Sequence, residues 1–184
     1  MNVLALFKYL FVTTLFVASS TALALPTGMM GTLSLGNRTG EVDVSGNGSS
    51  GSGKTDNAAQ YLGAKIGYVN LVNQGVGYIL RGALNSKISG SGWASFTELR
   101  PEGNVAFGFN DVVYGFAGLN FSTYLSGFED WGMGLGIQLG AGYMITPQVA
   151  LELQYITSNY SFEKAGYDVD VTLKSLEVSV GYTF

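Results

Sequence analysis

A glycine-rich stretch from Gly48 to Thr55 has the residue types and spacing of a phosphate-binding loop. Its order, G-x-x-x-x-G-K-T, is that of the loop that holds nucleotide phosphates with backbone N–H groups and a lysine. Such a loop works only between a buried strand and the N-terminus of a helix. Here a Gly/Ser-rich run leads in, and an alternating, strand-like segment follows. We therefore expect neither a nucleotide nor a nucleic acid as a partner.

Catalysis has little support among the ionisable residues. The chain contains no histidine and no cysteine, so it lacks the usual general base, the commonest metal ligand and any thiolate. An acidic pair remains conceivable among carboxylates that we expect in solvated loops, namely Glu129, Asp130, Glu163, Asp168 and Asp170. Acidic residues in such loops are usually ordinary surface. We expect no enzyme, and no catalytic residue, metal or cofactor.

Four other charged residues lie on the polar faces of alternating segments: Lys65, Arg81, Glu152 and Glu177. Two are positive and two are negative. If the strands close into a barrel, these side chains can share one layer of its interior. Because charges in a narrow interior are costly unless they are paired, we expect a salt-bridge network that plugs the barrel. A gated ion path or small pore is the alternative role for these charges.

Residues 131–145 show most clearly how the elements are built. Every second residue is apolar, from Trp131 to Ile145, whereas the other positions are mostly glycine with one amide, Gln138. Side chains alternate between the two faces of a strand, so this pattern predicts one apolar face and one that is nearly bare backbone. A helix would mix the two sets and would carry five glycines, at about 1 kcal/mol each relative to alanine.

The positions of Trp131 and Tyr143 favour a lipid-facing orientation for this apolar face. They are twelve residues apart, near its two ends. That separation is ~40 Å along a strand, or ~28 Å of height at a tilt near 45°. These values fit an apolar band with aromatic residues at both membrane interfaces. The alternative is a soluble barrel that buries the same face.

The first 24 residues have the pattern of a secretory signal peptide. Lys8 is followed by a short apolar run, and Ala22 and Ala24 supply the small residues of a cleavage site. Cleavage after Ala24 leaves 184 − 24 = 160 residues and changes the formal charge from −4 to −5. We expect residues 25–184 to form one exported domain. The absence of cysteine indicates that no disulfide framework holds it together.

Alternation along residues 25–184 predicts eight strands. They are expected at residues 29–36, 58–69, 76–86, 102–109, 112–122, 131–145, 149–160 and 172–184. Long connections are expected at 38–57, 89–101, 123–130 and 161–171, and short ones at 70–75, 110–111 and 146–148. This strict alternation of short and long connections predicts an all-β, antiparallel up-and-down transmembrane β-barrel, with short periplasmic turns and longer extracellular loops.

Two features of this scheme stay open. The facing of residues 112–122 is ambiguous, because Tyr114 and Phe116 compete with the apolar residues at alternate positions. A β-bulge could reconcile both sets. The loop aromatics serve either adhesion or the upper interface girdle; they are Trp93, Phe96, Tyr124, Phe128, Tyr160 and Tyr167.

The C-terminal residues carry a family resemblance. Together with the signal peptide, the glycine-rich sixth strand and the Thr146-Pro147 turn, the ending Val178-Ser-Val-Gly-Tyr-Thr-Phe184 resembles the small outer-membrane β-barrels of Gram-negative bacteria, of the OmpA/OmpX type. The resemblance implies that the barrel assembly machinery reads the last strand. The positions that match this signal are Val178, Val180, Tyr182 and Phe184.

We therefore expect an integral outer-membrane barrel with a structural or surface-interaction role, in adhesion or envelope integrity. Its expected partners are outer-membrane lipids, lipopolysaccharide, the barrel assembly machinery and an extracellular ligand bound through the loops. A narrow channel or carrier for small solutes is one alternative. A soluble, lipocalin-like ligand-binding barrel is another.

Overall fold

The computed structural model describes residues 25–46, 49–54, 58–90, 97–126 and 133–184. The predicted signal peptide, with Ala22 and Ala24, lies outside these residues. The strands are β1 (Thr27–Gly46), β2 (Ser49–Lys54), β3 (Ala59–Asn70), β4 (Val76–Ser89), β5 (Thr97–Gly108), β6 (Val113–Ser126), β7 (Met133–Met144), β8 (Val149–Lys164) and β9 (Tyr167–Thr183). No helix among the described residues is long and apolar enough to cross a membrane.

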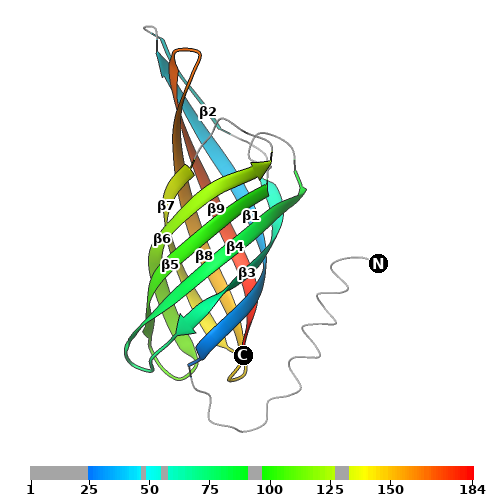
Figure 1. The fold of residues 1–184 in the computed structure, drawn as a ribbon, viewed down its shortest axis with the longest axis vertical. Coiled ribbons are helices and arrows are strands. Elements are labelled where there is room, and N and C mark those ends of the chain that lie inside the picture. The colour runs from blue at the N-terminus through cyan, green and yellow to red at the C-terminus, as the bar shows by residue number, and fades with distance from the viewer. Residues whose placement is uncertain (1–24, 47–48, 55–57, 91–96, 127–132) are drawn as a thin grey trace.

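Eight of these strands close into a ring (Figure 1). Each of β3 to β9 pairs antiparallel with its neighbour in the chain, and β9 pairs with β1 from Thr183↔Met30 to Asp168↔Ser45. The lower part of β1 also pairs with β3, which completes the closure. β2 stands outside the ring and pairs with the far end of β1. The predicted eight-stranded antiparallel barrel is confirmed.

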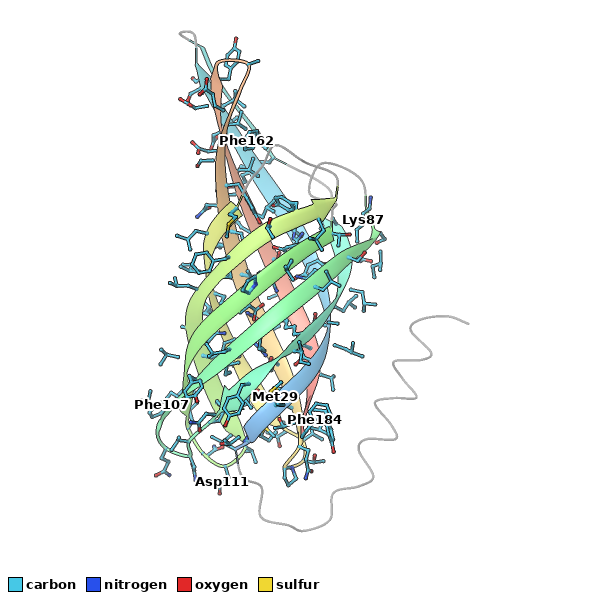
Figure 2. The ribbon with its side chains drawn as sticks, in the orientation of Figure 1. Met29, Lys87, Phe107, Asp111, Phe162 and Phe184 are labelled. Atoms are coloured by element: carbon cyan, nitrogen blue, oxygen red, sulfur yellow. The ribbon has the colours of Figure 1, made fainter. Side chains whose placement is uncertain are left out.

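The alternation of the sequence becomes the two faces of this wall. On β3, Ile66 is 64% exposed on the outside, whereas its neighbour Lys65 is 3% exposed inside. The same rule holds along β7, where Leu135, Ile137 and Leu139 point outward and the glycines and Gln138 point inward. Large apolar side chains therefore cover the outside of the barrel, as Figure 2 shows.

β6 follows a plain alternation, which settles the ambiguous facing of residues 112–122. Tyr114 and Phe116 point into the barrel, and Leu119 and Phe121 point outward. The register of β6 on β7 runs without interruption over this stretch, so no bulge is needed there. The inward aromatics fit because glycines of β7 leave room for their rings.

The long connections are more ordered than predicted, and two of the predicted loops were wrong. Residues 38–57 contain the second half of β1 and all of β2, and residues 161–171 contain the ends of β8 and β9. Pairing with neighbouring strands supplies the order that the Gly/Ser composition does not. The resulting four-stranded sheet rises well beyond the other strands (Figure 1). We call it the sheet extension: residues 41–46, 49–54, 159–164 and 167–172.

The predicted loop at residues 89–101 differs from the structure as well: it ends earlier than expected, because β5 begins at Thr97. Proline cannot donate to a β-ladder, so Pro101 is an unusual residue within a strand. In the structure Pro101 lies opposite Gly82 of β4, and the pairing of β5 with β6 is interrupted beside it. The proline thus occupies the kind of irregular position that strands tolerate.

Candidate functional site

The four charges predicted to face inward lie together inside the barrel. Arg81 Nη1 lies 2.5 Å from Glu152 Oε2, and Lys65 forms an ion pair with Glu177. All four side chains are essentially inaccessible to solvent. They come from β3, β4, β8 and β9, so closure of the ring is what brings them into contact.

Four further charged residues, which the sequence reasoning did not assign to the interior, join the same network. They are Arg38, Glu98, Arg100 and Glu102. Arg100 connects the two groups, because its Nη2 lies 2.9 Å from Glu102 Oε1 and 3.1 Å from Glu177 Oε2. Arg38 pairs with Glu98, and Glu102 lies 3.5 Å from both Lys65 and Arg81. The eight side chains therefore form one connected and neutral network.

The alternation of residues along β5 indicates that three of these four residues face inward. Glu98, Arg100 and Glu102 are spaced by two and are in phase with inward Asn104 and Ala106. Glu102 begins the predicted strand 102–109 in this inward phase, and extending that strand backward with the same period places Glu98 and Arg100 inside as well. Arg38 is likewise in phase with the inward residues of β1.

Neutral side chains add hydrogen bonds to the network. The Tyr114 hydroxyl donates to Glu152 Oε1 at 2.7 Å, and the Tyr61 hydroxyl donates to Glu177 Oε2 at 3.0 Å. Lys65 Nζ donates to Gln154 Oε1 at 2.7 Å. Aromatic rings also pack on guanidinium groups: the Arg81 Cζ lies 5.4 Å from the centre of the Phe116 ring. Such contacts lower the cost of burying charge.

Apolar clusters lie inside the barrel on both sides of the charge network. The cluster at the base contains Leu25, Met30, Val69, Leu71, Ile79, Ala106, Tyr114, Phe116, Met144 and Ala150. The cluster at the other end is built on Tyr160, Val171 and Leu173. An eight-stranded barrel has room for side chains and little else, and here the side chains form three layers.

The outside of the barrel is an apolar band of membrane dimensions. On β7 it runs from Met133, 71% exposed, to Tyr143, 52% exposed. Ten residues at ~3.3 Å and a tilt near 45° give ~23 Å of height, close to the ~25 Å of a lipid-facing band. A soluble barrel has the opposite arrangement, with its apolar side chains inside. The exterior therefore fits lipid, not water.

The residues predicted for the interfaces and for assembly lie on this exterior. Tyr143 points outward, and Trp131 falls outside the described residues. Val178, Tyr182 and Phe184 are exposed on the outer face of β9 or at its end, and Val180 is half-buried on the same face. The backbone N–H of Phe184 donates to the Met29 carbonyl, which fixes the C-terminus beside β1.

Several solved structures share this closed arrangement of strands. Neisserial surface protein A is 17% identical over 85% of this chain and 97% of its own, with a TM-score of 0.50. The chain has the fold of a small eight-stranded outer-membrane β-barrel. The outer-membrane protein OprG of Pseudomonas aeruginosa has a TM-score of 0.48, at 14% identity over 89% of this chain and 99% of its own. No protein-family model matches the barrel's sequence, and no curated protein matches it.

The sheet extension gives this barrel two different faces beyond the membrane band. Its inner face continues the inside of the barrel and is apolar, with Val42, Val44, Val169 and Phe162 half-buried and Tyr160 buried. Its outer face continues the lipid-facing side but is polar and acidic. The carboxylates on it are Glu41, Asp43, Glu163, Asp168 and Asp170. This change of the outer face from apolar to acidic marks where the lipid-facing band ends.

Glu41 lies between two lysines at the base of the extension. Its carboxylate is 3.0 Å from Lys54 Nζ and 2.9 Å from Lys174 Nζ. The hydrogen bond from Lys174, and to a lesser extent that from Lys54, holds the pKa of Glu41 below its usual range. Lys54 is the lysine of the phosphate-loop-like stretch. Lys54 is the last residue of the edge strand β2 and forms an ion pair with a carboxylate. The described residues 49–54 therefore form a strand, without the helix N-terminus that holds phosphate in such loops.

Two of the loop aromatics occupy other places than the interface girdle. Tyr160 points into the barrel, and Tyr124 packs against it with ring centres 4.9 Å apart. The girdle interpretation was wrong for both, because β6 continues past its predicted end with the same alternation and Tyr160 is in phase with the inward residues of β8. Tyr167 lies in the sheet extension. The remaining three, Trp93, Phe96 and Phe128, lie outside the described residues.

Proposed function

We propose that the protein is a non-enzymatic barrel of the bacterial outer membrane, exported by a signal peptide cleaved after Ala24, that acts through its extracellular surface in adhesion or envelope integrity. The observation that carries this proposal is the filled interior, in which a neutral charge network lies between two apolar clusters. Such an interior stabilises the barrel and leaves no continuous polar path through the described side chains. The extracellular surface is then the part of the protein that is available to bind partners.

The charge distribution supports a surface role. The chain without its first 24 residues has 8 basic and 13 acidic residues, and four of each belong to the interior network. The other residues therefore number 4 basic and 9 acidic, and they carry the whole net charge of −5. The net charge of the protein therefore lies outside the interior network, and the exposed carboxylates of the sheet extension contribute to it, where they can influence partners.

The carboxylates once considered for catalysis fit the same role. Glu163, Asp168 and Asp170 lie exposed on the outer face of the sheet extension, where they are solvated. Glu129 and Asp130 lie outside the described residues. Lipids and lipopolysaccharide surround the apolar band in this proposal, and the barrel assembly machinery reads the outward residues of β9.

Planar-bilayer recording tests the closed interior. We expect the folded mature chain to give no stepwise conductance, whereas a Tyr114→Ala and Phe116→Ala double variant opens the base of the interior and raises the frequency of openings. A steady unitary conductance of the unchanged protein would contradict a filled interior and favour a narrow channel.

Cells that carry a shortened protein test the surface role. Replacing residues 41–54 and 161–170 by short turns removes most of the sheet extension and keeps the membrane band, with Tyr160 and Val171 of the inner cluster in place. We expect the shortened barrel to fold but to lose attachment or to leave cells more sensitive to detergent, compared with cells that carry the full-length barrel. Cells indistinguishable from the full-length strain in both assays would overturn the surface role.

A further inference from the structure

We propose that β2 is a docking edge for an extended polypeptide segment in which basic and apolar residues alternate, and which adds to the sheet extension as its next strand. This inference rests on the proposed surface role and names the chemistry of the partner. Three independent features of β2 carry it: a free backbone edge, an uncovered apolar face and an acidic opposite face.

The backbone edge of β2 is free among the described residues. All six residues of β2 pair with β1, from Glu41↔Lys54 to Gly46↔Ser49, and no described strand pairs with its other side. A strand edge presents a row of unpaired N–H and C=O groups that an extended peptide can match. The serine and glycine residues 50–53 have small side chains and leave that row open.

The inner face of the sheet extension is only partly covered by side chains at β2. Gly53 and Gly51 lie opposite Val42 and Val44, and a Cβ added to either glycine would meet nothing within 4 Å. The two valines are accordingly only half-buried. Every second side chain of an added strand would lie over the glycines and cover these valines, so apolar residues fit at those positions.

The β8 edge differs in this respect. There the inner face ends in Tyr160, which is 1% exposed, and in Phe162. Val171, the cross-strand partner of Tyr160, is also 1% exposed. At β8 the base of the inner face is covered by Tyr160 and Val171, and Phe162 fills the position above them, so β8 has no open glycine positions like Gly51 and Gly53 of β2. This difference between the two edges favours β2 as the place where a strand is added.

The outer face beside β2 fits basic side chains. Asp43 and Asp170 are direct cross-strand partners. They border an open surface depression of about 300 Å³, which is also lined by Val44, Ser45, Ser50, Gly51 and Ser52. The other side chains of an added strand point to this face, because faces alternate along a strand. A lysine or arginine opposite Ser50 or Ser52 can extend across β2 toward Asp43, which lies two strand spacings or ~10 Å away. Asp170 lies one strand further, and it adds with the net charge of −5 outside the interior network to the attraction for a basic segment. Lys54, at the end of β2 on this face, is already paired with Glu41.

The test uses peptide probes and the whole mature chain in phosphatidylcholine nanodiscs. The probe is a ten-residue peptide of alternating lysine and valine. The controls are a peptide of alternating glutamate and valine, and a peptide with the probe's composition in two blocks. We expect the alternating lysine peptide to bind at least about tenfold more tightly than either control. Equal binding of the three peptides, or no binding of the probe, would overturn the proposal.

Amide hydrogen exchange locates the bound strand. We expect the probe to slow exchange at β2, and to leave exchange at residues 160–164 of β8 unchanged. Empty nanodiscs provide the blank for binding to lipid. Protection confined to β8, or binding without protection of β2, would show that the peptide does not add as the next strand.

Double variants separate the contribution of the acidic outer face to probe binding from that of the apolar inner face beside Gly51 and Gly53. Asp43→Asn with Asp170→Asn should weaken probe binding about tenfold, whereas Glu163→Gln with Asp111→Asn removes the same charge elsewhere and should change it little. Gly51→Asn with Gly53→Asn places polar side chains over the open space beside the valines and should also weaken probe binding. Unchanged exchange of the other barrel strands verifies that each variant folds.

The failure of this inference is distinguishable from failure of the proposed function. A barrel that conducts ions would contradict the filled interior and would not change the result at β2. Absence of strand addition would remove the basic partner, and attachment or envelope assays on the shortened barrel would still report on the surface role.

Discussion

The ion pair of Arg81 with Glu152 shows how a single buried residue depends on its partner. Both side chains are inaccessible, and Glu152 also accepts the hydroxyl of Tyr114. Removing one partner leaves an uncompensated charge, which typically costs about 3–5 kcal/mol. We therefore expect Arg81→Met to lower the free energy of unfolding by that amount, measured by urea titration of the barrel in lipid vesicles.

A double variant provides the control for this prediction. Arg81→Met with Glu152→Gln removes both charges and keeps an acceptor for Tyr114, so it should lose less stability than Arg81→Met alone. Additive losses in the double variant would argue against a coupled pair. For comparison, Lys54→Met alters an ion pair whose lysine side chain is 74% exposed, and exposed pairs typically contribute below about 1 kcal/mol.

At the scale of elements, the glycines of β7 and the aromatics of β6 form a matched packing. A Cβ at Gly142 would overlap the ring of Tyr114, and one at Gly140 would overlap the ring of Phe116. The Tyr114 ring cannot move away easily, because its hydroxyl is bound to Glu152. The pattern of glycine on one strand therefore determines where the neighbouring strand can place large side chains inside the barrel.

Gly142→Ala tests this packing. Overfilling a packed interior typically costs about 1–3 kcal/mol, so we expect a loss of that size in the unfolding free energy. The matched control is Gly82→Ala, because a Cβ at Gly82 meets nothing within 4 Å. Equal stability of the two variants would show that the β6–β7 packing is looser than the structure indicates.

At the scale of the whole molecule, the apolar exterior requires a lipid-like solvent. Leu33, Ile66, Val105 and Ile137, from four different strands, are each more than 60% exposed, and in water this surface would drive aggregation. We expect the mature chain to become rich in β-structure only in detergent or lipid, and to migrate differently on a gel when boiled and unboiled. A β-rich monomer in plain buffer would contradict the membrane orientation.

The sequence by itself predicted the eight strands of the closed antiparallel barrel and the faces of all of them except residues 112–122. The period of two is a local property, and it survives wherever apolar and small or polar residues alternate, as along β3, β7 and β9. The same period placed Lys65, Arg81, Glu152 and Glu177 on inward faces, since a face depends only on the phase of its own strand.

Only the tertiary structure decided how far the strands run and which side chains meet. β2 is built of serine, glycine and lysine, and it is ordered because β1 lies beside it. Arg38, Glu98 and Arg100 became interior residues because β1 and β5 continue past the points where composition suggested loops. The partners in the charge network come from distant parts of the chain, so their pairing depends on the register across the closed ring. A local pattern carries no such information, because register is set by contacts between strands.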